Sequence, residues 1–291
     1  GTTGGSATIS PNLSLTGSGT AVVTLGSGSY FNKLDFGTTV FNPGTTNLNL
    51  NSLTLSATGT YTTLTSTMVG TGIITPNTNT TLGALTVNST SGTTTLAAAL
   101  TTVATATTTL TSGTLDLAGF VLTTGIFSSN NTNTRSIAFG TGNIVLATTT
   151  VTTVLSMATA TGFTYTGTGN FFSDASIDRV FNFGSGGGGS TTNSPNLTFT
   201  GSGVGAIGCA AASWFNKLDF GTIGSTVNSP SSPFRATLNL NTLILSATGT
   251  YALLLPTFVG TGTITSNGNT TLATLTINST SGTTTATDAV R

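Results

Sequence analysis

A long internal repeat constrains this sequence more than any other feature. The phrase Phe-Asn-Lys-Leu-Asp-Phe-Gly-Thr occurs at residues 31–38 and again at 215–222, about 184 residues later. Other phrases recur in the same order, and their separation grows to about 190 residues, which an insertion near residues 230–234 explains. They match 11–19 with 195–203, 53–61 with 243–251, 69–72 with 259–262 and 88–93 with 278–283. Such periodicity indicates a tandem architecture in which each repeat packs on its neighbours.

The repeat divides the chain into three expected segments. Residues 1–95 form a first repeat block, 96–194 an unmatched β spacer ending in a glycine-rich loop, and 195–291 a second block. The second block stops where the first would run on into its spacer, so we interpret it as truncated. This order favours a window on a longer tandem array; a complete protein with two homologous lobes is the alternative.

The composition excludes most active-site chemistry. Only 4% of the 291 residues are charged, the formal net charge is zero, and the chain has one Cys and no His or Glu. A catalytic triad, a zinc site and any general base other than Asp are therefore excluded, and we predict no catalytic residue, metal ligand or cofactor. Zero net charge gives no basic surface for nucleic acid. No apolar run reaches the length of about 18 residues that a membrane span needs.

Short alternating segments predict the secondary structure. Apolar and polar residues alternate at period two, which is typical of half-buried strands, and strand-forming Thr, Val, Ile, Phe and Tyr outnumber helix formers. Two-residue hairpin turns are scarce, so a wound coil is favoured over a meander. The predicted fold class is all-β, a parallel β-solenoid of tandem repeats; a string of β-sandwich domains is the alternative. Examples of these segments are residues 13–16, 47–50, 85–87, 114–117, 144–146 and 275–277.

Two phrases in residues 82–147 carry a resemblance to a known group of proteins. These are Leu-Thr-Ser-Gly-Thr-Leu-Asp-Leu-Ala-Gly-Phe at 110–120 and Asn-Thr-Arg-Ser-Ile-Ala-Phe-Gly-Thr-Gly-Asn-Ile at 133–144. They resemble the Thr/Gly-rich β-solenoid repeats found in large surface or fibre proteins of aquatic bacteria and their phages. The resemblance covers about half of the chain and implies an extracellular, fibrous or adhesive role, with no catalytic residues.

The twice-used phrase supplies the candidate functional residues. Its Lys and Asp lie two residues apart, so in a strand they point to one face, while the Leu between them and the Phe after Asp point inward. We expect an exposed ion pair at a strand edge or between subunits, which would act as a register device between coils or protomers. The predicted assembly or register pairs are Lys33 with Asp35 and Lys217 with Asp219.

Three other features have structural interpretations. Asp174, Asp178 and Arg179 lack calcium-repeat spacing, so we expect Asp174 to cap a turn and Asp178 to pair with Arg179. Residues 184–190, Gly-Ser-Gly-Gly-Gly-Gly-Ser, lack the ending of a phosphate loop and predict a flexible linker or loop. Cys209 lies in an apolar setting and is expected to be buried and inert.

These observations favour a non-enzymatic structural protein that forms or decorates an extracellular or virion-associated filament. It would assemble with copies of itself, end to end or laterally. The alternative is an adhesin or phage tail-fibre module that binds cell-surface glycan, which exposed aromatic residues on one face would favour. A polysaccharide-degrading enzyme is a third hypothesis and would require a cleft that gathers two or three Asp residues.

Overall fold

In a computed structural model the chain divides into two compact units. The first unit comprises Gly1–Ser128, Asn133–Ile144 and Phe163–Thr168, and the second comprises Ser129–Thr132, Val145–Gly162 and Gly169–Arg291. The insertion expected near residues 230–234 lies outside the described residues. Those are 8–16, 20–21, 25–38, 40–41, 46–77, 81–150, 152–174, 177–200, 207–221, 237–248, 251, 254–268, 272, 274–279 and 282–289.

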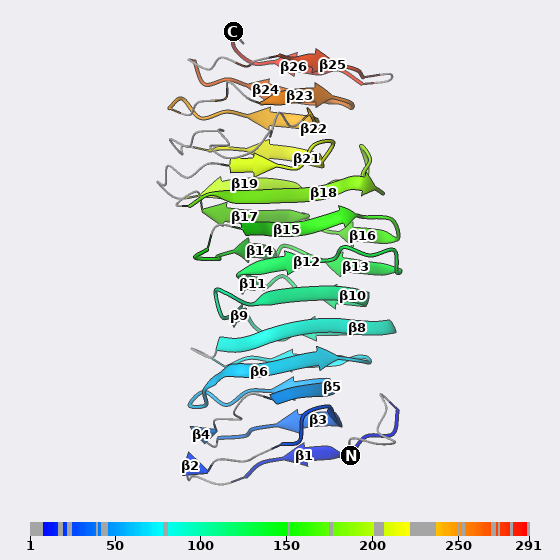
Figure 1. The fold of residues 1–291 in the computed structure, drawn as a ribbon, viewed down its shortest axis with the longest axis vertical. Helices are drawn as coiled ribbons and strands as arrows, with labels where there is room; N and C mark the ends of the chain where they lie inside the picture. Colours follow the sequence, from blue (N-terminus) through cyan, green and yellow to red (C-terminus); the bar gives the residue numbers. More distant parts are fainter. Residues whose placement is uncertain are drawn as a thin grey trace. The chain divides into compact units, whose positions relative to one another are not determined.

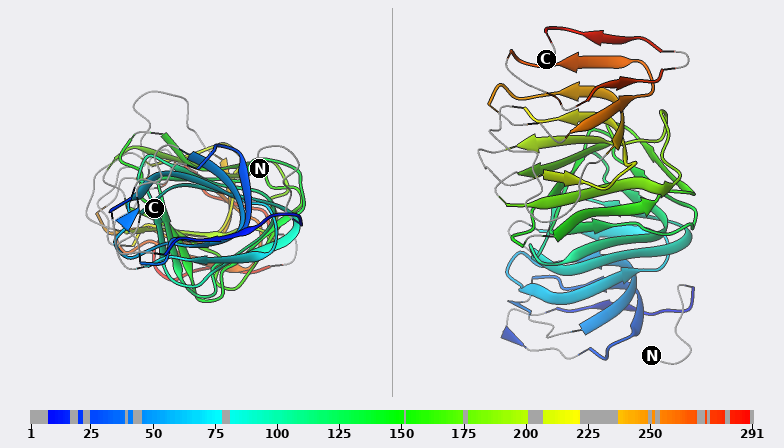
Figure 2. Two further views of the ribbon diagram at one scale, coloured as in Figure 1. Left: turned by 90° about the horizontal axis from the view of Figure 1, so that it is seen from below. Right: turned by 45° about the horizontal axis from the view of Figure 1, so that its top comes forward.

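The described residues form strands and no helix, and the chain is a parallel β-solenoid of about 10 turns. Successive strands are hydrogen-bonded in parallel, so the chain winds repeatedly in one sense (Figures 1 and 2). This confirms the predicted fold class. It excludes the β-sandwich alternative, because strands in those sandwiches pair antiparallel.

The first unit stacks its strands in parallel, with register shifts where β6 and β10 pair with β8. β1 pairs with β3, β3 with β5, β5 with both β6 and β7, and both of these with β8, which continues to β9 and β10. Its strands are β1 (Asn12–Ser14), β2 (Thr20–Ala21), β3 (Ser29–Asp35), β4 (Val40–Phe41), β5 (Thr46–Thr54), β6 (Tyr61–Met68), β7 (Gly72–Thr75), β8 (Thr81–Leu96), β9 (Leu100–Thr102), β10 (Thr107–Asp116), β11 (Val121–Thr124), β12 (Ile126–Ser128), β13 (Arg135–Ala138) and β16 (Phe163–Thr166); β14 (Asn143–Leu146) contributes residues to both units.

The second unit has the same construction. β17 pairs with β19, β19 with β21, β21 with β22, and β22 with both β23 and β24, which continue to β25 and β26. Its strands are β15 (Thr152–Thr159), β17 (Asn170–Asp174), β18 (Arg179–Gly187), β19 (Asn196–Thr200), β20 (Ile207–Cys209), β21 (Trp214–Asp219), β22 (Thr237–Ile244), β23 (Leu255–Phe258), β24 (Gly262–Thr265), β25 (Thr276–Ile277) and β26 (Thr284–Ala286).

Columns of apolar side chains fill the interior of each unit. Residues at equivalent positions of the two repeat blocks occupy equivalent positions in these columns. Because alternate residues of a strand face the interior and neighbouring strands pair in parallel, each strand adds one member to a given column. In the first unit one column consists of Leu13, Leu34, Leu53, Ile74 and Leu96. Its counterpart in the second unit consists of Leu197, Leu218, Leu243 and Ile264, and the exposed Ala286 follows Ile264 in register.

The glycine-rich segment differs from the prediction of a flexible loop. β18 runs as far as Gly187, so the first four residues of that segment belong to a strand. Gly184 has a positive φ of 69°, and an added Cβ there would lie 2.7 Å from the Cα of Gly189. Gly184 and Gly189 pack directly on each other, which explains why both positions are glycine.

Candidate functional site

The predicted ion pairs are present in both units, and each joins two residues of one strand. The Lys33 ammonium lies 3.0 Å from the Asp35 carboxylate on β3, and the Lys217 ammonium lies 3.1 Å from the Asp219 carboxylate on β21. Lys33 is the most exposed of the four side chains, at 46%. Leu34 and its counterpart are buried, as the alternation predicts. The role of these pairs in register or assembly stays a prediction.

Each Asp of these pairs also closes a turn. One Asp35 carboxylate oxygen accepts the backbone N–H of Gly37 at 2.9 Å, and Asp219 accepts that of Gly221 at the same distance. Both glycines have positive φ, 57° and 54°, which favours glycine. The Gly37 hydrogen bond chiefly lowers the pKa of Asp35, and Lys33 lowers it further, while burial opposes them.

Asparagine side chains beside the ion pairs form a ladder that links one strand to the next. In the first unit Asn32 donates to the Oδ1 of Asn12 at 2.8 Å, and Asn51 donates to the Oδ1 of Asn32 at 3.0 Å. The donor amides thus point in one direction along the stack. Such a chain of amides satisfies polar groups without charge and favours one register of the strands.

The second unit repeats the ladder and adds one rung. Asn196 donates to Asn170 at 2.9 Å, Asn216 to Asn196 at 2.8 Å, and Asn241 to Asn216 at 3.0 Å. Sequence reasoning favoured ladders of amide and hydroxyl side chains between coils in general but named none of these residues, although Asn32 and Asn216 belong to the repeated phrase. The recurrence of Asn at equivalent positions of both blocks was the available signal.

A buried tyrosine completes the shared design. The Tyr61 hydroxyl accepts the backbone N–H of Ser56 at 3.0 Å and lies 2.9 Å from its hydroxyl oxygen; Tyr251 and Ser246 repeat the contact at 2.9 and 2.8 Å. Burial raises the pKa of both tyrosines, although the serine hydrogen bonds act in the opposite direction. Phe36 packs on Tyr61 with ring centroids 4.9 Å apart.

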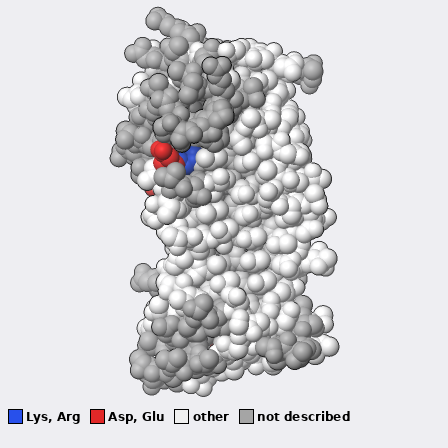
Figure 3. Space-filling view, in the orientation of Figure 1, with Lys and Arg blue, Asp and Glu red and all other residues white. Residues whose placement is uncertain are grey.

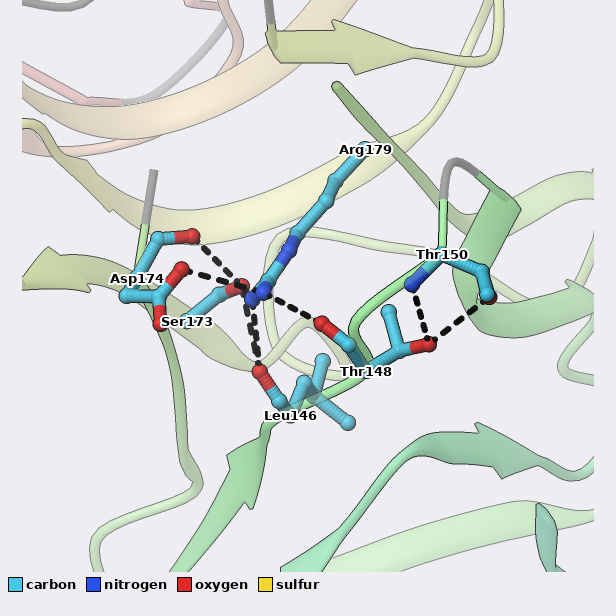
Figure 4. Close-up of polar contacts among 6 residues, drawn as sticks. All are labelled: Leu146, Thr148, Thr150, Ser173, Asp174 and Arg179. Carbon is cyan, nitrogen blue, oxygen red and sulfur yellow. Dashed lines mark hydrogen bonds and ion pairs between the residues drawn. The ribbon is translucent and has the colours of Figure 1, made fainter. Parts of the chain in front are cut away.

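A buried arginine holds a polar cluster in the second unit (Figure 4). The guanidinium of Arg179 donates to the carbonyl oxygens of Leu146 and Thr148, both at 2.7 Å, and to the Ser173 hydroxyl at 2.6 Å. It also lies 3.0 Å from the carboxylate of Asp174, and its side chain is 2% exposed. Burial lowers the pKa of Arg179, and Asp174 opposes that effect. The guanidinium thereby ties the end of β14 and the residues just after it to the end of β17.

The structure corrects the sequence interpretation of this cluster. The sequence suggested Asp178 as the partner of Arg179, whereas the carboxylate that lies 3.0 Å from the guanidinium is that of Asp174. The turn-capping role expected of Asp174 stays a prediction. Arg179 is also buried. Its side chain points to the same inner side of β18 as the side chains of Phe181 and Phe183.

Arg135 is the second buried arginine, in the first unit. Its guanidinium donates to the Asn133 carbonyl at 2.9 Å and lies 5.7 Å from the centre of the Phe163 ring. Burial lowers its pKa. Sequence reasoning missed it, although alternation with Ile137 on β13 places it inward.

Cys209 is buried, as predicted, and burial raises the pKa of its thiol to about 12. A thiol with such a pKa has almost no thiolate at neutral pH, so it is a poor nucleophile.

The remaining polar surface is almost uncharged. On the face drawn in Figure 3, charged atoms gather at one place and the other described atoms are neutral. Within the described stretches, no three His, Cys, Asp or Glu residues lie close enough together to hold a metal ion. The same stretches contain no helix long and apolar enough to cross a membrane. The described side chains therefore link neighbouring strands by hydrogen bonds, and the Asp residues described above take part in turns and ion pairs.

Comparison with known proteins gives no relative. No protein-family model matches the chain, and searches of curated proteins and of solved structures found no significant match.

Proposed function

We propose that the chain is a non-enzymatic structural protein that forms or decorates an extracellular or virion-associated β-rich filament. The observation that carries the proposal is the repeated ladder. Equivalent Asn side chains connect successive strands in both units, together with backbone pairing and apolar columns. Such stacking resists local opening, because each strand is held by the strands on both sides.

The placement of aromatic side chains supports this function over an adhesive one. Large aromatic residues of both units are buried at stacked interior positions, among them Phe127, Phe139, Phe171 and Phe181. A glycan-binding face needs aromatic rings open to solvent, and Phe120, at 38%, is the one large aromatic among the described residues that is exposed.

The neutral surface supports association between copies. Charges at sheet edges normally prevent strands of different molecules from pairing, and a net charge near zero promotes association. Here the Lys and Asp of the repeated phrase neutralise each other within a strand. We therefore propose assembly end to end, through backbone edges, or laterally, through Thr- and Asn-rich faces.

Electron microscopy of the purified chain over a concentration series tests the proposal. We expect filaments or bundles that persist in high salt, since screening weakens charge attraction and not hydrogen bonding. Single particles at every concentration, with a monomeric mass in sedimentation, would contradict it.

A glycan-binding module remains the second candidate, favoured by one observation. Tyr30 is half-buried beside the exposed Asn32 on β3, and an aromatic ring next to amides suits sugar recognition. Glycan-array binding that Tyr30→Ala abolishes would favour this candidate; absence of binding to any glycan on the array would count against it.

A further inference from the structure

A regular array of small, neutral side chains lies on the outer side of the first unit. It crosses β5, β6, β8, β10 and β12, which pair in parallel one after another (Figure 1). Each strand contributes two residues that lie two positions apart, so the array has two ranks. We define this outer array by its members. One rank consists of Asn49, Thr67, Thr86, Thr109 and Ser128, and the other of Asn47, Thr65, Ala84, Thr107 and Ile126.

Strand pairing gives the array its even spacing. The register shifts of β6 and β10 against β8 lie outside the array, so both ranks run unbroken from strand to strand. Neighbours within a rank are therefore about 4.7–4.9 Å apart, and the two ranks lie about 6.6 Å apart along the strands. Successive members of a rank are 18 to 23 residues apart in the sequence, so the order arises from the fold and not from a fixed sequence period.

The side chains of the array point outward. The residues between the two ranks, among them Leu48, Leu85 and Phe127, are buried, and side chains alternate along a strand. The five Thr of the array are each partly exposed. The array thus presents hydroxyl, methyl and amide groups and no charged group.

The Thr hydroxyls of the array are left to bond with water. Elsewhere in the unit, hydroxyls bond to one another: Thr114 and Ser136 lie 2.8 Å apart, and the buried Thr102 donates to Thr124 at 3.0 Å. Within the described part of the chain, no side-chain hydrogen bond involves the five Thr of the array. Their β-branched side chains have few rotamers, which keeps the hydroxyl and methyl groups in fixed positions.

We propose that the outer array is an ice-binding face. Its two spacings, between strands and along them, are close to repeats of the water oxygens on faces of hexagonal ice. A Thr hydroxyl both donates to and accepts from water, so ordered hydroxyls can hold water molecules in a lattice that continues into ice. The inference does not rest on the proposed filament, and end-to-end assembly leaves the array uncovered.

The composition of the array favours ice over a crystalline polysaccharide. A flat sugar surface is bound chiefly by aromatic rings that stack on it, and no member of the array is aromatic. The absence of charge in the array also disfavours an ionic mineral surface, which would need charged groups.

Partitioning of the 291-residue chain into slowly grown ice, from dilute solution, tests the proposal. We expect the wild type to enter the ice and to inhibit ice recrystallisation. Thr86→Lys places a long charged side chain in the middle of one rank and should lose both properties. Thr123→Lys is the matched control, because Thr123 is a partly exposed Thr on β11, outside the array, and this variant should behave as the wild type does.

A second variant guards against misfolding of the first. Thr67→Lys changes the neighbouring member of the rank and should also stay in the liquid, with circular dichroism showing that the variants are folded. Exclusion of the wild type from ice would overturn the proposal. An equal loss in Thr123→Lys would overturn it as well, because the effect would then belong to the added charge. Retention of the wild type on crystalline cellulose, with none in ice, would assign the array to a polysaccharide instead.

Discussion

At the scale of the residue, Asn216 shows how one side chain connects three strands. It donates to Asn196 and accepts from Asn241, so it forms two bonds of the ladder, whereas Asn170 forms one of them, as an acceptor. A half-buried amide with both sides engaged is costly to remove, because its two neighbours lose partners.

We therefore predict a graded effect along the ladder. Asn216→Ala should lower the free energy of unfolding by about 1–3 kcal/mol, and Asn170→Ala by about half as much, since fewer neighbouring polar groups lose a partner. Urea titration followed by circular dichroism measures both. Equal effects from the two variants would contradict a ladder in which interior rungs contribute more.

Cys209 allows a second prediction at this scale. Because its thiol is buried and its pKa is about 12, we expect no reaction with a thiol reagent at pH 8 in the folded protein and full reaction in denaturant. Rapid labelling under native conditions would show that β20 opens readily.

At the scale of the element, the side chain of Arg179 forms hydrogen bonds that link the ends of two strands. The guanidinium binds the Leu146 carbonyl at the end of β14, the Thr148 carbonyl beyond it and the Ser173 hydroxyl of β17, so one side chain gives a charged donor to all three groups. The planar fork of Arg suits this arrangement, and the single ammonium of Lys does not.

Arg179→Ala should therefore be strongly destabilising. We expect a loss of about 3 kcal/mol or more, because two carbonyls and one hydroxyl lose a charged donor at roughly 1–3 kcal/mol each. Arg179→Lys should recover only part of the loss. Asp174→Ala, at a side chain that is half exposed, should cost about 1 kcal/mol or less. Thermal unfolding of the three variants checks the order, and a larger cost for Asp174→Ala would show that the ion pair dominates.

The elements also show what sequence could and could not predict. Period-two alternation predicted the strands and the inward side chains, and the same alternation places Arg135 and Arg179 inside. The ladder was not predictable from spacing. Its rungs lie 20 and 19 residues apart in the first unit, but 26, 20 and 25 in the second, because the connections between strands vary in length.

At the scale of the whole molecule, the near absence of titratable groups governs the response to pH. Without His, the side chains have no ordinary titration between about pH 5 and pH 8. The groups with shifted pKa values act outside that window. The pKa of Asp35 is lowered, and those of Tyr61, Tyr251 and Cys209 are raised.

We predict that the free energy of unfolding is nearly constant around neutral pH and falls at both low and high pH. Asp35, with a folded pKa below its unfolded value, contributes stability above about pH 4 that disappears as the pH falls further. The raised pKa values of Cys209 and the tyrosines contribute stability below about pH 9–10 that is lost as the pH rises. Urea midpoints measured from pH 2 to pH 11 check this, and a slope near pH 6.5 would contradict it.

The equivalence of the two ladders has a consequence for how such a gene changes. A recombination event that adds or removes one whole block joins an Asn-bearing strand to the same kind of strand, so the amide chain and the apolar columns continue across the junction. A change in length by a whole block should therefore disturb the stack less than a point mutation within a rung does.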